Sequence, residues 1–150
     1  MNAIHKRVEI IRQWLKKKGL DAIIIPHEDE YLSEYIPPEN ERLAWITGFT
    51  GSAGLAIITQ EKAAIFVDGR YTVQVREQVD SSLYTILHIS KDPYLKWLKT
   101  ILNSNAHVGY DSRLQRANWK INTEKILADN ITLIPIDKNP IDLYWDDRPS

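Results

Sequence analysis

Two glycine-bearing runs on either side of a predicted β-hairpin constrain the fold of this chain more than any other feature. Residues 46–54 hold three of the six glycines, and residues 66–71 hold a fourth within Asp-Gly-Arg. Between these runs, the apolar and β-rich segments 55–59 and 63–67 predict two strands joined by a three-residue turn. Clustered glycine indicates unusual backbone dihedrals or a close approach of the backbone to another group. These two turns are therefore the first candidates for a functional site.

The rest of the chain alternates between helix and strand patterns. An apolar stripe between Asn2 and Gly19 predicts a capped helix, and the apolar run 22–25 that follows predicts a buried strand. Further helices are expected at 42–46, after Arg70, from Pro93 and over 114–128. In the last of these, Trp119, Ile126 and Leu127 are expected to face inward. Strands are expected at 84–89, 107–110 and 132–135. Such alternation predicts an α/β fold.

The composition fits one ordinary globular domain. With 150 residues, of which 43% are hydrophobic and 26% charged, the chain can bury a core. The net charge of -1 gives no reason to expect a nucleic-acid or membrane partner. The absence of cysteine excludes disulfides, thiol catalysis and Cys-ligated zinc. The N-terminus lacks the apolar core of a signal peptide, and no run approaches the roughly 18 apolar residues of a membrane span, so a cytoplasmic location is expected.

Two familiar chemistries do not fit the first glycine run. Gly48, Gly51 and Gly54 are spaced three apart and precede a strand, whereas a phosphate-binding loop must open a helix. The surroundings of Ser52 resemble Gly-x-Ser-x-Gly, but Thr50 replaces the first glycine and the helix of a nucleophile elbow is missing. We therefore expect a tight turn packed against the sheet.

The histidines and carboxylates predict no metal centre. His27 and Glu28 begin a pattern like His-Glu-x-x-His, but the fifth position is Tyr31. The other three histidines are scattered along the chain. No cluster has the number of ligands that zinc or manganese needs, so we expect no metal ligand and no complete catalytic group in this chain.

The second glycine run places an aspartate and an arginine directly after a predicted strand. The carboxyl end of a strand is where α/β sheets place ligands, and Arg70 could there hold a carboxylate or a backbone carbonyl in its fork. Asp68 is close enough to orient the guanidinium or to cap the following helix. A local Asp–Arg pair, or a cap without any ligand, explains the same residues equally well.

Six segments of the chain occur in an order that resembles a known family. They are Asp21-Ala22-Ile23-Ile24-Ile25-Pro26, Ser33-Glu34-Tyr35-Ile36, the run 46–54, Val67-Asp68-Gly69-Arg70-Tyr71, Val108-Gly109-Tyr110-Asp111 and Trp145-Asp146-Asp147-Arg148-Pro149. Together they resemble the N-terminal domain of Xaa-Pro aminopeptidases (aminopeptidase P), in the creatinase/prolidase superfamily, metallopeptidase family M24. One residue departs from the pattern, because Thr50 stands where the family commonly has an aspartate, while the glycines of the turn are kept.

The resemblance implies both a fold and a reaction. The fold is three-layered α/β/α, with a mixed sheet of about six strands, a ribonuclease H-like motif and helices on both faces. The reaction is that of the whole enzyme, a manganese-dependent removal of an N-terminal residue that precedes proline, in which two divalent metals activate a water. The family's metal ligands lie in a C-terminal domain absent from this chain. The chain is therefore expected to hold no cofactor, to contain no catalytic residue and to be inactive alone.

The resemblance assigns few roles within this chain. Arg70 matches the arginine that contacts the bound peptide, and Asp68 and Tyr71 are expected to support it. The loop around 33–35 is expected near the substrate cleft.

The domain boundaries follow from the same resemblance. Residues 1–150 are expected to form one creatinase-type domain of a longer chain, with 140–150 as a linker to a middle domain. An apolar cluster at 141–145 leaves open that this segment folds back instead.

The expected partners are a peptide with proline in second position, the middle and C-terminal domains, and a second copy in a homodimer. The alternative is a stand-alone module of the same fold that acts in binding or assembly without peptidase activity. A reading frame that continues past Ser150 into the metal ligands would separate the two.

Overall fold

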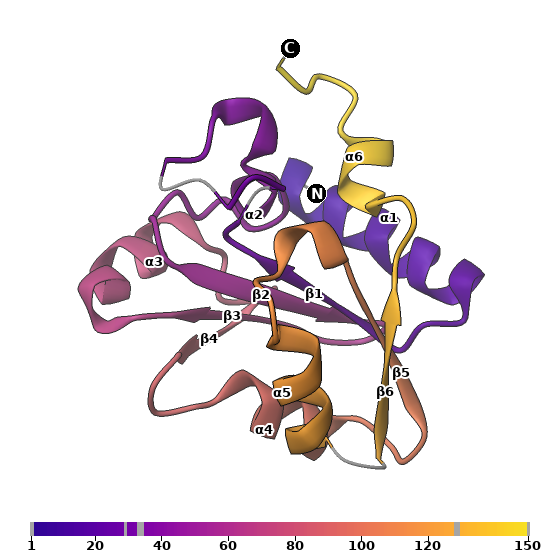
Figure 1. Cartoon of the computed structure of the whole chain (residues 1–150). Helices are drawn as coiled ribbons and strands as arrows, with labels where there is room; N and C mark the ends of the chain where they lie inside the picture. Colours follow the sequence, from indigo (N-terminus) through magenta and orange to yellow (C-terminus); the bar gives the residue numbers. More distant parts are fainter. Residues whose placement is uncertain (1, 29, 33–34, 128–129, 150) are drawn as a thin grey trace.

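A mixed six-stranded sheet lies at the centre of the computed structural model, which describes residues 2–28, 30–32, 35–127 and 130–149 (Figure 1). The strand order is β4-β3-β2-β1-β5-β6. The strands are β1 (Ala22–Pro26), β2 (Gly54–Thr59), β3 (Ala63–Val67), β4 (Thr85–His88), β5 (Ala106–Tyr110) and β6 (Ile131–Pro135). Only β2 runs antiparallel to its neighbours, so the carboxyl ends of the other five strands and the start of β2 share one edge of the sheet. We call this edge the carboxyl edge.

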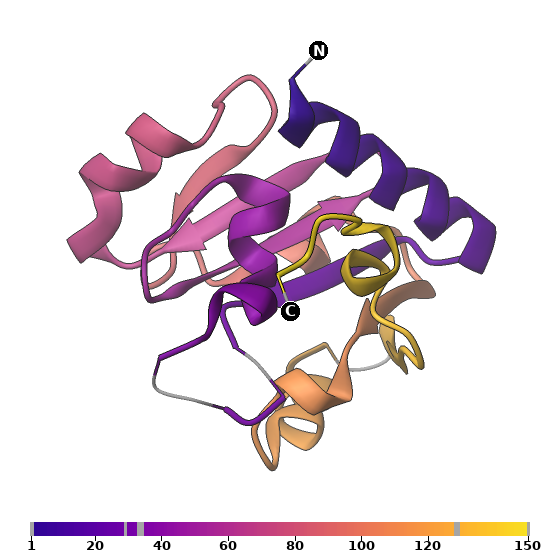
Figure 2. The same cartoon turned by 90° about the horizontal axis from the view of Figure 1, so that it is seen from above.

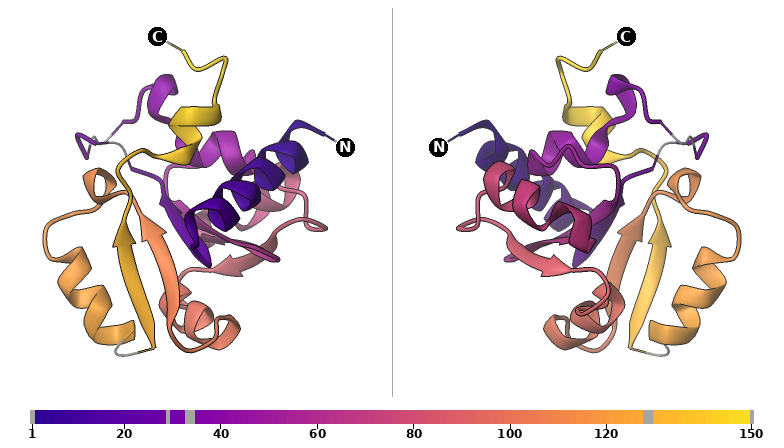
Figure 3. Two further views of the ribbon diagram at one scale, coloured as in Figure 1. Left: turned by 90° about the vertical axis from the view of Figure 1, so that its right-hand side faces the viewer. Right: turned by 90° about the vertical axis from the view of Figure 1, so that its left-hand side faces the viewer.

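Helices cover both faces of the sheet, as the resemblance implies. They are α1 (Ala3–Lys18), α2 (Arg42–Thr47), α3 (Thr72–Gln78), α4 (Tyr94–Ile101), α5 (Trp119–Leu127) and α6 (Pro140–Tyr144), with 3-10 turns η1 (Pro38–Asn40), η2 (Gly69–Tyr71) and η3 (Ser112–Leu114). One hydrophobic cluster joins the sheet to α1, α2, α3 and α6, and a second joins it to α4 and α5. Figure 3 shows α1 and α5 on opposite sides of the sheet.

The first helix and strand show why these residues form these elements. The Asn2 side chain accepts a hydrogen bond from the backbone N–H of His5, and Gly19 ends α1 at φ 69°, a left-handed conformation that favours glycine. In β1, Ile23 and Ile25 face one hydrophobic cluster while Ile24 faces the other. The predicted continuous apolar strand is thus buried on both faces.

The helix predicted over 114–128 is wrong at its start. Residues 112–114 form η3, and Asn118 takes a left-handed φ of 71°, so α5 begins only at Trp119. Ile126 is 53% exposed rather than turned inward, whereas Leu127 is buried. The apolar spacing could not reveal this break, because a single left-handed residue changes the direction of the chain without changing its hydrophobic pattern.

The apolar cluster near the C-terminus folds back onto the domain. Ile141 of α6 is fully buried, and the ring of Trp145 stacks on Trp45 with centroids 6.2 Å apart. Figure 2 shows α6 beside α2 and α1. Residues 140–145 therefore belong to the domain, and a linker role for the residues after them stays a prediction. Across the described ranges, every helix is too short or too polar to cross a membrane.

Candidate functional site at the carboxyl edge

The first glycine run forms a turn packed around one aromatic ring. Gly48 ends α2 with φ 85°, and Phe49 is fully buried beneath the turn. A Cβ atom added at Gly51 would collide with the Phe49 ring, so only glycine fits there. The structure confirms the expected tight turn, which leads into β2 and not into a helix.

The two glycine runs meet in space. The Ser52 hydroxyl is hydrogen-bonded to the Tyr71 hydroxyl, and the ring of Phe49 packs edge-on against Tyr71 at 5.6 Å between centroids. The backbone N–H of Thr50 donates to Gln78 Oε1 over 3.0 Å, and Gln78 Nε2 donates to the Thr50 hydroxyl over 2.9 Å. Thr50 therefore ties the turn to α3 at the position where the related family commonly has an aspartate.

Asp68 and Arg70 form a fork at the end of β3. Asp68 Oδ1 accepts the backbone N–H of Arg70 at 2.9 Å, which caps η2. Its Oδ2 also accepts Arg70 Nε at 3.1 Å and Nη2 at 2.9 Å, and these hydrogen bonds hold the pKa of Asp68 below its usual range. The guanidinium carbon lies 5.2 Å from the centroid of the Tyr71 ring. Asp68 and Tyr71 thus both contact the Arg70 side chain, and their role in supporting a peptide-binding arginine stays a prediction.

The pair with Asp68 does not occupy every hydrogen-bond donor of the Arg70 guanidinium. Its side chain is 70% exposed, and Nη1 has no hydrogen-bond partner among the described residues. The local ion pair and the helix cap that sequence reasoning allowed are both present, and a donor remains free at the carboxyl edge. The role of Arg70 in binding a peptide stays a prediction.

A second fork of the same design follows β5, and sequence reasoning missed it. Asp111 Oδ1 accepts the backbone N–H of Arg113 at 3.0 Å, and its Oδ2 accepts Arg113 Nη2 at 2.8 Å. Asn139 Nδ2 also donates to this carboxylate over 3.1 Å. Asp111 is only 3% exposed. The signal was available, because Asp-x-Arg follows a predicted strand in both places.

An ion cluster surrounds the second fork. It consists of Glu30, Arg42, Asp111, Arg113, Asp142 and Arg148. At its centre the fully buried Arg42 side chain lies 2.7 Å from Asp142 and 3.3 Å from Glu30. Burial alone would lower the pKa of Arg42, but these two carboxylates outweigh it and raise the pKa, so Arg42 stays charged. The cluster ties α2, η3 and α6 to the loop after β1.

His27 anchors that same loop through Glu41. Its Nε2 lies 2.8 Å from Glu41 Oε1, an atom with no other hydrogen-bond partner among the described residues. The hydrogen bond to Glu41 outweighs burial and raises the pKa of His27. In the described ranges, no three His, Asp or Glu side chains gather as a metal site would require. The residues described here therefore do not fit the two metals that the resemblance implies for the whole enzyme.

The loop expected near the substrate cleft is only partly described. Ser33 and Glu34 lie outside the described residues, while the Tyr35 side chain is 85% exposed. A cleft of about 350 Å³ opens at the carboxyl edge between His27, the turn at Ser52 and the ring of Trp119. It borders the turn that Tyr71 fastens, so it lies next to the first fork.

The strand order and the helices on both faces define an α/β domain with a mixed six-stranded sheet. The family model of the Creatinase/Prolidase N-terminal domain matches residues 7–141, and the chain belongs to this family.

Relatives of the chain are much longer than the chain itself. Xaa-Pro aminopeptidase 2 of Homo sapiens is 38% identical over 141 residues, which cover 93% of this chain and 21% of that protein. Xaa-Pro aminopeptidase 2 of Rattus norvegicus is 36% identical over 145 residues, 95% of this chain and 22% of that protein. The chain thus spans about a fifth of the length of these curated relatives.

Solved structures show the same fold. The X-prolyl aminopeptidase of Caenorhabditis elegans, a cytosolic enzyme with a di-nuclear active site, superposes with a TM-score of 0.90 at 26% identity. The match covers 100% of this chain and 26% of that one. A chain of the Xaa-Pro aminopeptidase of Streptococcus thermophilus shares the fold with a TM-score of 0.71 at 23% identity, over 95% of this chain and 98% of that chain.

Proposed function

We propose that this chain is the non-catalytic N-terminal domain of a larger Xaa-Pro aminopeptidase, which hydrolyses the bond between an N-terminal residue and a following proline. The family membership and the human and nematode relatives support this assignment. The metals, for which we propose manganese, would belong to a C-terminal domain. A cytoplasmic homodimer with middle and C-terminal domains completes the proposal, and the nematode enzyme's cytosolic location supports the compartment.

The chain's own contribution is to shape the substrate cleft and to present Arg70. The observation that carries this role is an exposed guanidinium fixed by Asp68 at the carboxyl edge. A guanidinium donates hydrogen bonds in a planar fork that fits a peptide carbonyl or carboxylate. Because the Asp68 carboxylate and the Tyr71 ring already hold the side chain, binding costs less side-chain entropy than it would for a free arginine.

The test is Arg70→Ala in the complete polypeptide that the gene encodes, assayed on peptides with proline in second position. We expect kcat/KM to fall by roughly 10-fold or more, since a hydrogen bond to a charged group contributes about 1.5–3 kcal/mol. Arg76→Ala is the matched control, because Arg76 is an exposed arginine on α3 close to the same edge. Unchanged kinetics for Arg70→Ala, with both variants folded, would reduce Arg70 to a structural role.

The stand-alone module remains the second candidate, because the described residues gather no group of His, Asp or Glu side chains that could hold a metal ion. Two measurements separate it from the peptidase domain. The first is whether the reading frame continues into a catalytic domain. The second is whether residues 1–150 alone release an N-terminal residue in the presence of manganese. We expect a continuing frame and no release, and release by the isolated chain would contradict the non-catalytic role.

A further inference from the structure

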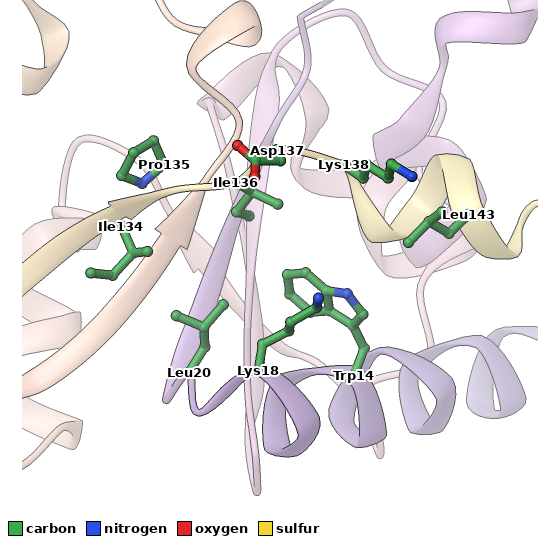
Figure 4. A pocket seen from close by; sticks show the side chains of 9 residues that line it. All are labelled: Trp14, Lys18, Leu20, Ile134, Pro135, Ile136, Asp137, Lys138 and Leu143. Atoms are coloured by element: carbon green, nitrogen blue, oxygen red, sulfur yellow. The ribbon is translucent and has the colours of Figure 1, made fainter.

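A second concave site lies on the flank of the sheet, between the C-terminal half of α1 and the segment that leaves β6. Its volume is about 420 Å³, which falls within the range of small-molecule pockets. Figure 4 shows Trp14, Lys18 and Leu20 on the α1 side and Ile136 and Lys138 on the opposite side. The site shares no lining residue with the cleft beside the first fork.

The pocket combines an apolar wall with two positive charges at its rim. Leu20 and Ile136 contribute adjacent apolar surface, since a Cδ1 atom of each lies close to the same point above Gly109. Lys18 and Lys138 are both exposed, and neither ammonium group forms an ion pair with a described residue. Asp137 is the single carboxylate among the lining residues, so the formal charge of the lining is positive. This combination favours a ligand with an apolar body and one negative charge.

The wall also contains a buried donor that lacks an acceptor. Trp14 is 3% exposed, and its indole N–H has no hydrogen-bond partner among the described residues. A buried N–H group without an acceptor costs about 1–3 kcal/mol, so most such groups in folded proteins are paired. A ligand oxygen could supply the missing acceptor. Because this N–H lies beneath the surface of the wall, a ligand can reach it only by displacing a side chain at the rim. Leu143 lies at the rim, and 51% of its surface is exposed.

We propose that this pocket binds a small carboxylic acid with an aromatic or aliphatic body, in its ionised form. The apolar body packs on the surface that Leu20 and Ile136 form together, and the carboxylate accepts hydrogen bonds from the indole N–H of Trp14 and from the lysine ammonium groups. The size of the pocket suits one small molecule and not a helix or a strand. This inference does not depend on the proposed peptidase function.

The probe is phenylbutyrate, titrated into the 150-residue chain while proton–nitrogen correlation spectra record the indole N–H signals. Trp14→Phe identifies the Trp14 signal among those of the five tryptophans. We expect phenylbutyrate to shift the Trp14 signal and the backbone signals of residues 134 and 136–138, since Pro135 has no N–H. Phenylbutanol, which has the same apolar body without the charge, should bind about 10-fold more weakly.

Charge variants complete the test. Lys18→Gln and Lys138→Gln should each weaken phenylbutyrate binding by about 2–5-fold, as expected for exposed charge pairs, and higher salt should weaken binding by the wild type. Lys17→Gln is the matched control, because Lys17 is an exposed lysine of α1 that does not line the pocket. Three results would each overturn the proposal. The wild type could bind phenylbutanol as tightly as phenylbutyrate, the Lys18 and Lys138 variants could bind phenylbutyrate as tightly as the wild type, or millimolar phenylbutyrate could leave the Trp14 signal unshifted.

Discussion

The forks after β3 and β5 have the same sequence pattern and the same local geometry but opposite surroundings. In each, the aspartate caps a 3-10 turn by accepting the N–H of the arginine two residues on, and it also holds that arginine's side chain. The side chains of Asp68 and Arg70 are 31% and 70% exposed, whereas those of Asp111 and Arg113 are 4% and 48% exposed. The pattern Asp-x-Arg after a strand thus builds the fork, and the surroundings decide its use.

Those surroundings come from distant parts of the chain. Asp111 also accepts a hydrogen bond from Asn139, whose own side-chain oxygen caps α6 by accepting the N–H of Ile141 at 2.9 Å. Arg113 faces Glu30 and Asp142, both at 3.6 Å. The fork after β5 therefore joins segments of the fold, while the fork after β3 bonds mainly within itself. A self-contained fork can engage a ligand without disturbing the fold.

The largest expected difference between the forks is in stability. Asp111→Ala removes the acceptor from the half-buried Arg113 and leaves the buried Asn139 amide without its partner, so it should lower the free energy of unfolding by about 2–4 kcal/mol. Asp68→Ala should leave the free energy of unfolding nearly unchanged, because its fork faces solvent. Urea denaturation of both variants measures the difference. Equal losses in the two variants would show that burial does not distinguish the forks.

The sequence predicted what depends on local pattern. The cap of α1 at Asn2, the hairpin of β2 and β3 and the turn around Gly51 all rest on neighbouring residues, and the structure confirms them. The residues Asp68, Arg70 and Tyr71 were also found together, because they are adjacent in the chain.

The ion cluster could not be predicted in this way. Arg42 and Asp142 are 100 residues apart in sequence, and only the fold brings them within 2.7 Å. Nor could the apolar spacing show that Asn118 breaks the helix expected from residue 114. Contacts of this kind depend on where distant segments pack, and a single sequence without that placement carries no local signal for them.

The second expected difference appears at acid pH. Burial alone would raise the pKa of Asp111, but hydrogen bonds from Arg113 and Asn139 outweigh it and lower the pKa. Hydrogen bonds from Arg70 lower the pKa of Asp68 in the same direction. The unfolded state therefore takes up these protons first as the pH falls below about 4, and the stabilisation present above that pH is lost progressively.

Asn variants separate the two contributions to this acid loss. As the pH falls from 7 into the acid range, the melting temperature should fall less steeply for Asp111→Asn than for the wild type. Asp68→Asn should differ from the wild type in the same direction, but by a smaller amount. High salt should reduce the Asp68 contribution, which faces solvent, and spare that of Asp111. Asp80, whose pKa is lowered to about 2 by Ser82 and His5, contributes equally to the wild type and both variants and serves as the internal constant. If the melting temperature of Asp111→Asn falls with pH in parallel with that of the wild type, Asp111 does not contribute to the loss of stability at acid pH.

The smallest expected effect on stability concerns the middle residue of each fork, which is Gly69 in one and Ser112 in the other. The backbone does not require glycine at 69, since its φ lies outside the left-handed region that Gly19 and Gly48 adopt. An added Cβ would lie 3.2 Å from His88 Nε2, the end of a side chain that can shift by a few tenths of an ångström. Gly69→Ser should therefore change the free energy of unfolding by less than about 0.5 kcal/mol.

Under the proposed function, glycine at position 69 would let a ligand approach the backbone closely beside Arg70. Under the proposed function, Gly69→Ser in the complete polypeptide should raise KM for Xaa-Pro peptides while its melting temperature stays that of the wild type. The exchange in the other fork, Ser112→Gly, should leave KM unchanged and destabilise slightly, because glycine gives the unfolded chain more freedom. A KM that is unchanged in Gly69→Ser would mean that no ligand approaches the first fork at its backbone, and only the Arg70 side chain would then distinguish the two forks in function.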